Sequence, residues 1–199
     1  MDTISNISGL DGLIKDCTKC ALHLGRTQAV PGVGNTDAEL MLVGEGPGEE
    51  EDRQGLPFVG RCGQLLTTTL VEVGLNREDV FITNVVKCRP PKNRDPLPEE
   101  VAECQPFLKK QVELIKPKVI VALGRIAAAH LLGRSVKITK EHGSLDVLPF
   151  NEDVLASIIY HPSYVLRNRN TQIERDFHND LLEARNIAYG AVAPYQVST

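Results

Sequence analysis

Four of the five cysteines could together bind a metal centre. Cys17 and Cys20 are separated by two residues, whereas Cys88 and Cys104 lie far along the chain, about one helical segment apart. Zinc and a four-iron cluster both accept four thiolates, and the spacing does not separate them; the frequency of structural zinc sites slightly favours zinc. A Cys-x-x-Cys pair can also be a redox pair, although this one does not lie at a strand-to-helix turn. The fifth cysteine, Cys62, is expected to pack as a small residue at a helix start.

Four further residues could recognise a flat polar ring. Glu45, Asn84 and His161 lie near the ends of apolar runs, which meet at one edge of a parallel sheet. Phe58 could stack on the face of a ring. The Asn84 amide offers one donor and one acceptor, which suits an edge with an adjacent carbonyl and N–H, as in uracil, whereas cytosine presents the reverse pattern. A lone histidine after a strand is more often structural, so the combination of His161 with the other three indicates a binding site.

The segment 44–63 is expected to be a long loop that carries part of this site. It contains six glycines, two prolines and four consecutive acidic residues, and a helix should begin near Gln64. Connections usually have about 4–6 residues, so a loop of this length is more often functional or disordered than incidental. A solvated acidic loop is the alternative, and the apolar pair Phe58-Val59 argues against it.

Alternating strand and helix patterns should hold these residues in place. We expect strands at 40–43, 80–86, 119–123, 145–148 and 154–160, and helices at 4–16, 64–74, 98–115, 126–132 and 173–189. This order predicts an α/β fold with a central, mostly parallel β-sheet flanked by helices. We expect one domain over residues 1–190 and a loose tail over 191–199.

Composition limits the class of protein. The chain of 199 residues has a net charge of −4, no run of eighteen apolar residues and no signal-peptide pattern, so we expect a soluble cytoplasmic monomer without a membrane partner. An odd number of cysteines without a secretory signal argues against a disulfide framework. Nucleic acid would need a local basic patch, and two groups of residues could supply one: Lys87, Arg89, Lys92 and Arg94, and Arg167, Arg169 and Arg175.

Three motifs resemble those of one enzyme family. GEGPGEEEDRQGLPFVGR, ITNVVKCRPP and HPSYVLRN are similar to the motifs of the family 4 uracil-DNA glycosylases, the iron–sulfur type found in many prokaryotes, and the similarity extends roughly from Cys17 to Arg167. The resemblance implies a uracil-DNA glycosylase-like fold and uracil-containing DNA as the substrate. It also implies hydrolysis of the N-glycosidic bond, which releases uracil and begins base-excision repair.

The resemblance also assigns roles in the expected pocket. Glu45 matches the acid that orients the attacking water, and Gly46 and Pro47 match the turn whose backbone contacts uracil. Phe58 matches the stacking aromatic, Asn84 the residue that reads the base edge, and His161 the residue that binds the pyrimidine O2.

Outside the pocket, the resemblance implies a cofactor and a contact with DNA. It changes the expected metal group from zinc to a 4Fe–4S cluster held by Cys17, Cys20, Cys88 and Cys104. Because these ligands join the N-terminal segment to the basic loop 88–104, we expect the cluster to act as a structural clamp. A segment that enters the duplex is matched by Val165, Leu166 and Arg167.

Some alternatives remain open at this point. Glu51 could crowd the C5 methyl of thymine, although one acid in a run of four is more simply a surface residue. An iron–sulfur protein that binds DNA without hydrolysis is a second function, and Glu45, Asn84 and His161 argue against it. A third, electron transfer, fits poorly with ligands spread over almost ninety residues.

Overall fold

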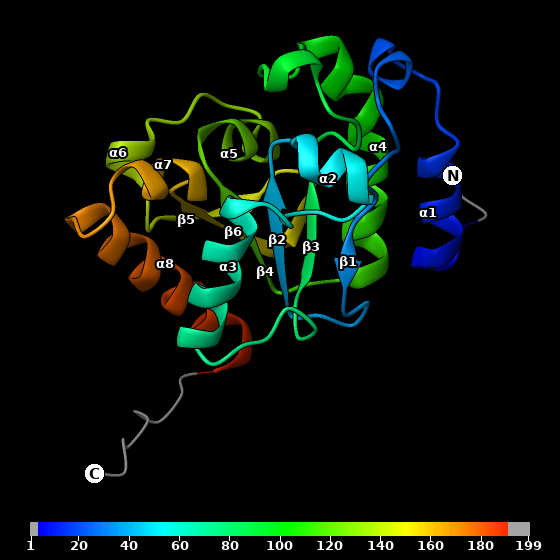
Figure 1. The fold of residues 1–199 in the computed structure, drawn as a ribbon. Helices are drawn as coiled ribbons and strands as arrows, with labels where there is room; N and C mark the ends of the chain where they lie inside the picture. Colours follow the sequence, from blue (N-terminus) through cyan, green and yellow to red (C-terminus); the bar gives the residue numbers. More distant parts are fainter. Residues whose placement is uncertain (1–3, 191–199) are drawn as a thin grey trace.

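Six strands form one sheet in the order β1-β3-β2-β4-β6-β5 in the computed structural model, which describes residues 4–190 (Figure 1). The central neighbours pair in parallel and the two edge strands, β1 and β5, pair antiparallel. The bounds are β1 Val33–Gly34, β2 Leu40–Gly44, β3 Phe81–Asn84, β4 Val119–Leu123, β5 Leu145–Leu148 and β6 Asn151–Ile159. The mostly parallel α/β sheet expected from the sequence is therefore confirmed.

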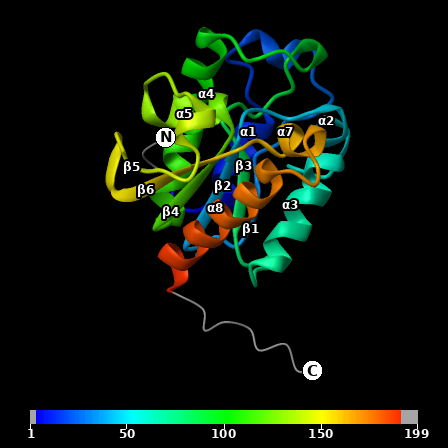
Figure 2. The same cartoon turned by 90° about the vertical axis from the view of Figure 1, so that its left-hand side faces the viewer.

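Helices cover both faces of the sheet (Figures 1 and 2). Helices α1, α4 and α5 pack on one face, and α3, α7 and α8 pack on the other. The α-helices are α1 Ile7–Lys15, α2 Glu49–Gln54, α3 Arg61–Glu72, α4 Pro98–Ile115, α5 Arg125–Leu132, α6 Ile138–Glu141, α7 Pro162–Arg167 and α8 Gln172–Tyr189, and two 3-10 turns are η1 Ala21–Leu24 and η2 Pro91–Asn93.

Strand β2 illustrates how the sequence builds two cores. Leu40 and Leu42 face the α3/α8 core, while Met41 and Val43 face the α1/α4 core. All four side chains are fully buried, since a central parallel strand is covered on both faces and its residues alternate between them. The strand therefore ends at a buried edge, directly before the glycine-rich segment.

Several boundaries differ from those expected. The segment 44–63 is not one long loop: α2 forms within it, because acidic residues in a first turn complement the positive end of the helix dipole, and α3 begins at Arg61 rather than Gln64. The short elements β1, α6 and α7 were not expected, because a strand of two residues or a helix of one to two turns has too few residues to show a period. Strand β3 ends at Asn84 rather than Val86, and β6 begins earlier, at Asn151.

Two expectations about domain boundaries remain predictions. The first is a single domain over residues 1–190. The second is a loose tail over residues 191–199, which lie outside the described residues. Among residues 4–190, no helix combines the length and the apolar character needed to cross a membrane.

Candidate functional site

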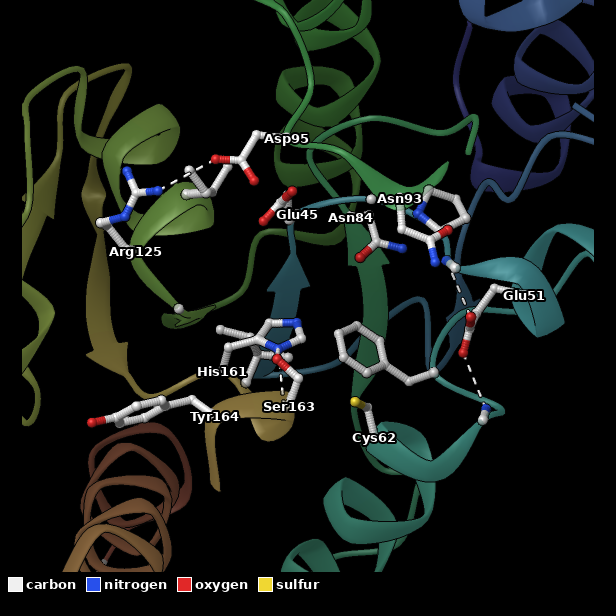
Figure 3. A pocket seen from close by; sticks show the side chains of 18 of the residues that line it. Glu45, Glu51, Cys62, Asn84, Asn93, Asp95, Arg125, His161, Ser163 and Tyr164 are labelled. Carbon is white, nitrogen blue, oxygen red and sulfur yellow. Dashed lines mark hydrogen bonds and ion pairs between the residues drawn. The ribbon is translucent and has the colours of Figure 1, made fainter. Parts of the chain in front are cut away.

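A cleft of about 780 Å³ lies at the carboxyl ends of the parallel strands. This is the edge at which open α/β sheets bind ligands. The cleft brings together residues from six separate stretches of the chain, within 45–51, 58–62, 84–95, 123–126, 138–139 and 160–167, and Figure 3 shows several of them around one space. Of the residues expected in the pocket or on DNA, those that line it are Glu45, Gly46, Pro47, Glu51, Phe58, Asn84, Arg94, His161 and Arg167.

Asn84 carries an unsatisfied polar atom into this cleft. It is the last residue of β3, its side chain is 1% exposed, and its Oδ1 has no hydrogen-bond partner. Leaving a buried acceptor unpaired costs on the order of 1–3 kcal/mol, so such atoms call for an explanation. Gly44 makes room for the amide, because a Cβ there would lie 2.4 Å from Asn84 Oδ1 and 2.6 Å from Phe58 Cζ. The arrangement suits a ligand that donates a hydrogen bond to Oδ1.

Phe58 is held in a strained conformation beside the amide. Its φ of 51° lies in the left-handed region, and its ring centroid is 6.3 Å from that of His161. The Arg77 guanidinium donates to the carbonyl oxygens of Phe58 (3.1 Å) and Pro57 (2.8 Å). Gly63 passes so close to the Phe58 carbonyl that no side chain fits there. These contacts hold the ring at the wall of the cleft, where Phe58 is 7% exposed.

Glu51 braces the segment that carries Phe58. Its Oε2 accepts from the Gly48 N–H (3.1 Å), and its Oε1 accepts from the N–H groups of Val59 (3.0 Å) and Gly60 (3.1 Å). The expectation of a plain surface acid is therefore wrong, because this partly buried carboxylate joins the start of α2 to the start of α3. Exclusion of thymine by Glu51 remains a prediction.

The carboxyl group of Glu45 has a pKa close to neutral pH. It directly follows β2, and burial raises its pKa from 4.5 to about 7. The negative charge of Asp95 adds to this increase, while Arg125 opposes it. Asp95 and Arg125 form an ion pair of 3.3 Å at the cleft wall (Figure 3). A carboxyl group with this pKa can take a proton from water near pH 7.

His161 is a neutral hydrogen-bond donor. It caps the N-terminus of α7, and the Ser163 N–H donates to its Nδ1 at 3.1 Å. A backbone N–H can only donate, so Nδ1 is the acceptor and the ring hydrogen lies on Nε2. Burial, with a smaller effect from Arg167, lowers the His161 pKa to about 4. Gly124 permits this position, because a Cβ there would lie 2.7 Å from the His161 Cβ.

The segment expected to enter DNA divides into exposed and buried residues. Val165 is fully buried in the α3/α8 core, so its expected contact with DNA is corrected: it anchors helix α7 instead. Leu166 is partly buried against the same core, and Arg167 is exposed at the cleft. Leu166 and Arg167 both keep exposed surface, so their expected contact with DNA remains a prediction.

The four candidate ligand cysteines surround a second, smaller cavity. Cys17 and Cys20 follow α1, Cys88 follows β3, and Cys104 lies on α4, while Cys62 lies apart in the cleft. Two hydrogen bonds point at sulfur: Arg26 Nη1 donates to Cys88 Sγ (3.0 Å), and the Lys87 N–H donates to Cys104 Sγ (3.2 Å). Such donors stabilise thiolates. Burial raises the pKa of Cys104 to about 11, so binding of a metal group would release its proton.

The donor set of the cysteine site fits an iron–sulfur cluster. Four cysteines line one cavity, and the sulfurs of Cys88 and Cys104 accept hydrogen bonds. Four thiolates are the ligands of a 4Fe–4S cluster, and hydrogen bonds to sulfur are among the contacts that set its properties. Zinc accepts the same four thiolates, so the donor set is shared by both metal groups.

Several residues of these sites could not be found from the sequence. Gly44, Arg77 and Gly124 act through neighbours that lie distant in the chain. Lys87, one of the candidates for a basic patch, is 1% exposed and therefore does not contribute to such a patch. Its place in the run VVKC, directly after apolar strand residues, was the one signal of burial.

Comparison with known proteins adds to this geometry. Residues 31–183 match the model of the Uracil DNA glycosylase superfamily. The chain is 52% identical over 175 residues to the Type-4 uracil-DNA glycosylase of Thermotoga maritima (87% of this chain and 90% of that one) and 45% identical over 182 residues to that of Archaeoglobus fulgidus (87% and 90%). The Type-5 uracil-DNA glycosylase of Thermus thermophilus is 35% identical over 182 residues (80% of each). The resemblance expected from the three motifs is thereby confirmed, and the chain belongs to the uracil DNA glycosylase superfamily.

Proposed function

We propose that this protein is a uracil-DNA glycosylase, a hydrolase that cleaves the N-glycosidic bond of uracil in DNA and so begins base-excision repair. The uracil-DNA glycosylases to which the chain is similar support this activity. The observation that carries the proposal is the buried, unpaired Oδ1 of Asn84 in a cleft walled by the ring of Phe58. Both features suit a planar base that has left the DNA stack.

Recognition of the base follows from the positions of hydrogen-bond donors and acceptors. Asn84 Oδ1 would accept from uracil N3–H and its amide nitrogen would donate to O4, while Phe58 stacks on the ring. Cytosine would place an acceptor against Oδ1 and a donor against the amide nitrogen, so it leaves both groups of Asn84 unpaired. Gly46 and Pro47 would contact uracil through their backbone.

Hydrolysis would use the two titratable groups of the cleft. As the bond between C1′ and N1 breaks, positive charge develops on the sugar and negative charge on uracil, and the His161 Nε2–H would donate to O2 to stabilise that anion. Removal of one such donor typically costs about 3 kcal/mol of barrier. The Glu45 carboxylate would orient a water and accept its proton as the water oxygen bonds to C1′. The uracil anion takes up a proton from solvent, and Glu45 returns its proton to solvent, so the products are an abasic sugar and uracil.

The four cysteines would hold a 4Fe–4S cluster outside this chemistry. When bound, the cluster would supply four metal–thiolate bonds that crosslink the segment after α1 to the segment after β3 and to α4. This crosslink would stabilise the fold and hold the loop 88–104 against DNA. We further place the protein in the prokaryotic cytoplasm as a monomer, with Arg167 on DNA phosphate or in a groove.

The test is release of free uracil from a duplex oligonucleotide with one G·U pair, with matched G·T and G·C duplexes as controls. The protein should be purified anaerobically so that the cluster is retained. Glu45→Gln serves as the inactive control, because it removes the proton acceptor and keeps the shape of the side chain.

Uracil release confined to the G·U duplex and lost in Glu45→Gln would support the proposal. Binding of all three duplexes without release of any base would instead favour the non-catalytic iron–sulfur protein. Equal release from G·U and G·C would contradict the assigned role of Asn84.

A further inference from the structure

Lys87 places a fully buried ammonium group between the cysteine site and the cleft. Its Nζ donates to Thr83 Oγ1 (2.6 Å), to the Asn84 carbonyl oxygen (2.7 Å) and to Gln111 Oε1 (2.7 Å). An ammonium has three donors, and all three are used here. The side chain therefore cannot move without leaving a buried charge and three buried acceptors unpaired.

The backbone of Lys87 is held as tightly as its side chain. The N–H donates to Cys104 Sγ (3.2 Å), the carbonyl oxygen accepts from the Val30 N–H (2.7 Å), and the next residue is Cys88. One residue thus contacts a candidate cluster ligand through its backbone and the base-reading residue through its side chain. Thr83 and Gln111 extend the network, because both donate to the Pro31 carbonyl oxygen.

Arg26 offers an internal comparison. It also donates to a candidate ligand, Cys88 Sγ, but its other hydrogen bond goes to the Lys15 carbonyl oxygen, away from the cleft. Removal of either cation changes the surroundings of the cysteines. Removal of Lys87 alone also frees the carbonyl of Asn84.

We propose that Lys87 is a positioning residue that fixes Asn84 for base recognition and makes this position depend on the cysteine site. Loss of the group that the cysteines hold would then weaken recognition of uracil as well as stability. The inference rests on the function proposed above. It extends that function by connecting the cysteine site with the base-reading residue. Within the hydrogen-bond network around Nζ, Lys87 is the residue that contacts both.

The test compares Lys87→Met with Arg26→Met and with Lys110→Met. Lys110 lies on α4, pairs with Glu113 at 2.7 Å and contacts neither site, so its substitution is the matched control for loss of a lysine. Four quantities are measured: iron and sulfide per chain, affinity for free uracil, KM and kcat on a G·U duplex, and hydrogen exchange of the Val85 and Val86 amides. Val85 and Val86 directly follow Asn84, and their N–H groups donate to the carbonyl oxygens of Gly44 and Glu45.

Lys87→Met should weaken free-uracil binding and raise KM by about tenfold or more, since one buried hydrogen bond to a charged group is typically worth that factor. It should also accelerate exchange at Val85 and Val86. In protein that retains its iron, Arg26→Met should leave free-uracil affinity within about twofold, whereas the fraction of this variant that has lost iron should bind uracil more weakly. Lys110→Met should change none of the four quantities. Equal effects of Lys87→Met and Arg26→Met on uracil binding at matched iron content, or none from Lys87→Met, would overturn the inference.

A second variant covers the case in which Lys87→Met does not fold. Thr83→Val keeps the charge and removes one of its three acceptors, so it should produce the same changes at smaller size. Unfolding of both variants would overturn positioning in favour of a purely structural role. If the wild-type protein releases no uracil, the proposed function fails, while amide exchange at Val85 and Val86 still decides whether Lys87 holds this strand end.

Discussion

The rate of uracil release should rise with the ionisation of Glu45 between pH 6 and pH 8. Only the carboxylate can accept a proton from water, and burial places its pKa at about 7. A group with this pKa is about one-tenth ionised at pH 6 and about nine-tenths at pH 8, so kcat/KM should increase about tenfold, with half of the rise complete near pH 7. His161 has a pKa of about 4 and does not titrate in this range.

Substitutions at the neighbouring ion pair should move this midpoint in opposite directions. Asp95 raises the Glu45 pKa and Arg125 lowers it. Asp95→Asn should therefore shift the profile to lower pH, and Arg125→Gln should shift it to higher pH. Glu45→Gln should lower kcat/KM by about 100-fold or more and remove the dependence on pH. The assay is single-turnover uracil release over a pH series at constant ionic strength.

Stability gives an independent check of the same pKa. The unfolded carboxyl ionises near 4.5 and the folded one near 7, so the folded state binds more protons in this window and wild-type stability should fall as the pH rises through it. Glu45→Gln should therefore raise Tm at pH 8 but not at pH 4. A profile with no rise between pH 6 and pH 8, or one that keeps its midpoint in both Asp95→Asn and Arg125→Gln, would refute the reasoning.

Three further predictions concern recognition and the cysteine site. Asn84→Asp should lower kcat/KM on G·U by about 10–100-fold and weaken the preference over cytosine, because the amide donor to O4 is lost; an unchanged preference, measured against Asn35→Asp at an exposed position outside the cleft, would contradict the assigned role. Phe58→Ala should raise KM by about 10–100-fold through loss of stacking, and a normal KM with a low kcat would place Phe58 elsewhere in the reaction. Cys88→Ala should lower iron content, Tm and DNA affinity together, whereas Cys62→Ala should retain iron; equal iron loss in both variants would count against the ligand set.

The order of strands and helices could be predicted because it depends on local periodicity. Residues 119–123 and 145–148 form the strands expected there, and the helix from Pro98 ends at Ile115, before Pro117. The ends of the strands follow from the same pattern, so Glu45, Asn84 and His161 could be expected at one edge of the sheet. The four cysteines could be grouped in the same way, from residue type and spacing.

Only the tertiary structure decided what surrounds these residues. Lys87 and Val165 look available for DNA in the sequence, yet both are buried. Glu51 looks like a surface acid until its three backbone partners are seen. The partners of Cys88 and of Gln111 lie 62 and 80 residues away, and no local pattern encodes such contacts.

The sequence by itself thus determined the family, the elements and the residue types that could carry out the chemistry. The tertiary structure decided the pKa of Glu45, the tautomer of His161, the unpaired oxygen of Asn84 and the connection through Lys87. The physical reason is that periodicity acts between neighbours in the chain, whereas burial and hydrogen bonding depend on which distant segments the fold packs together.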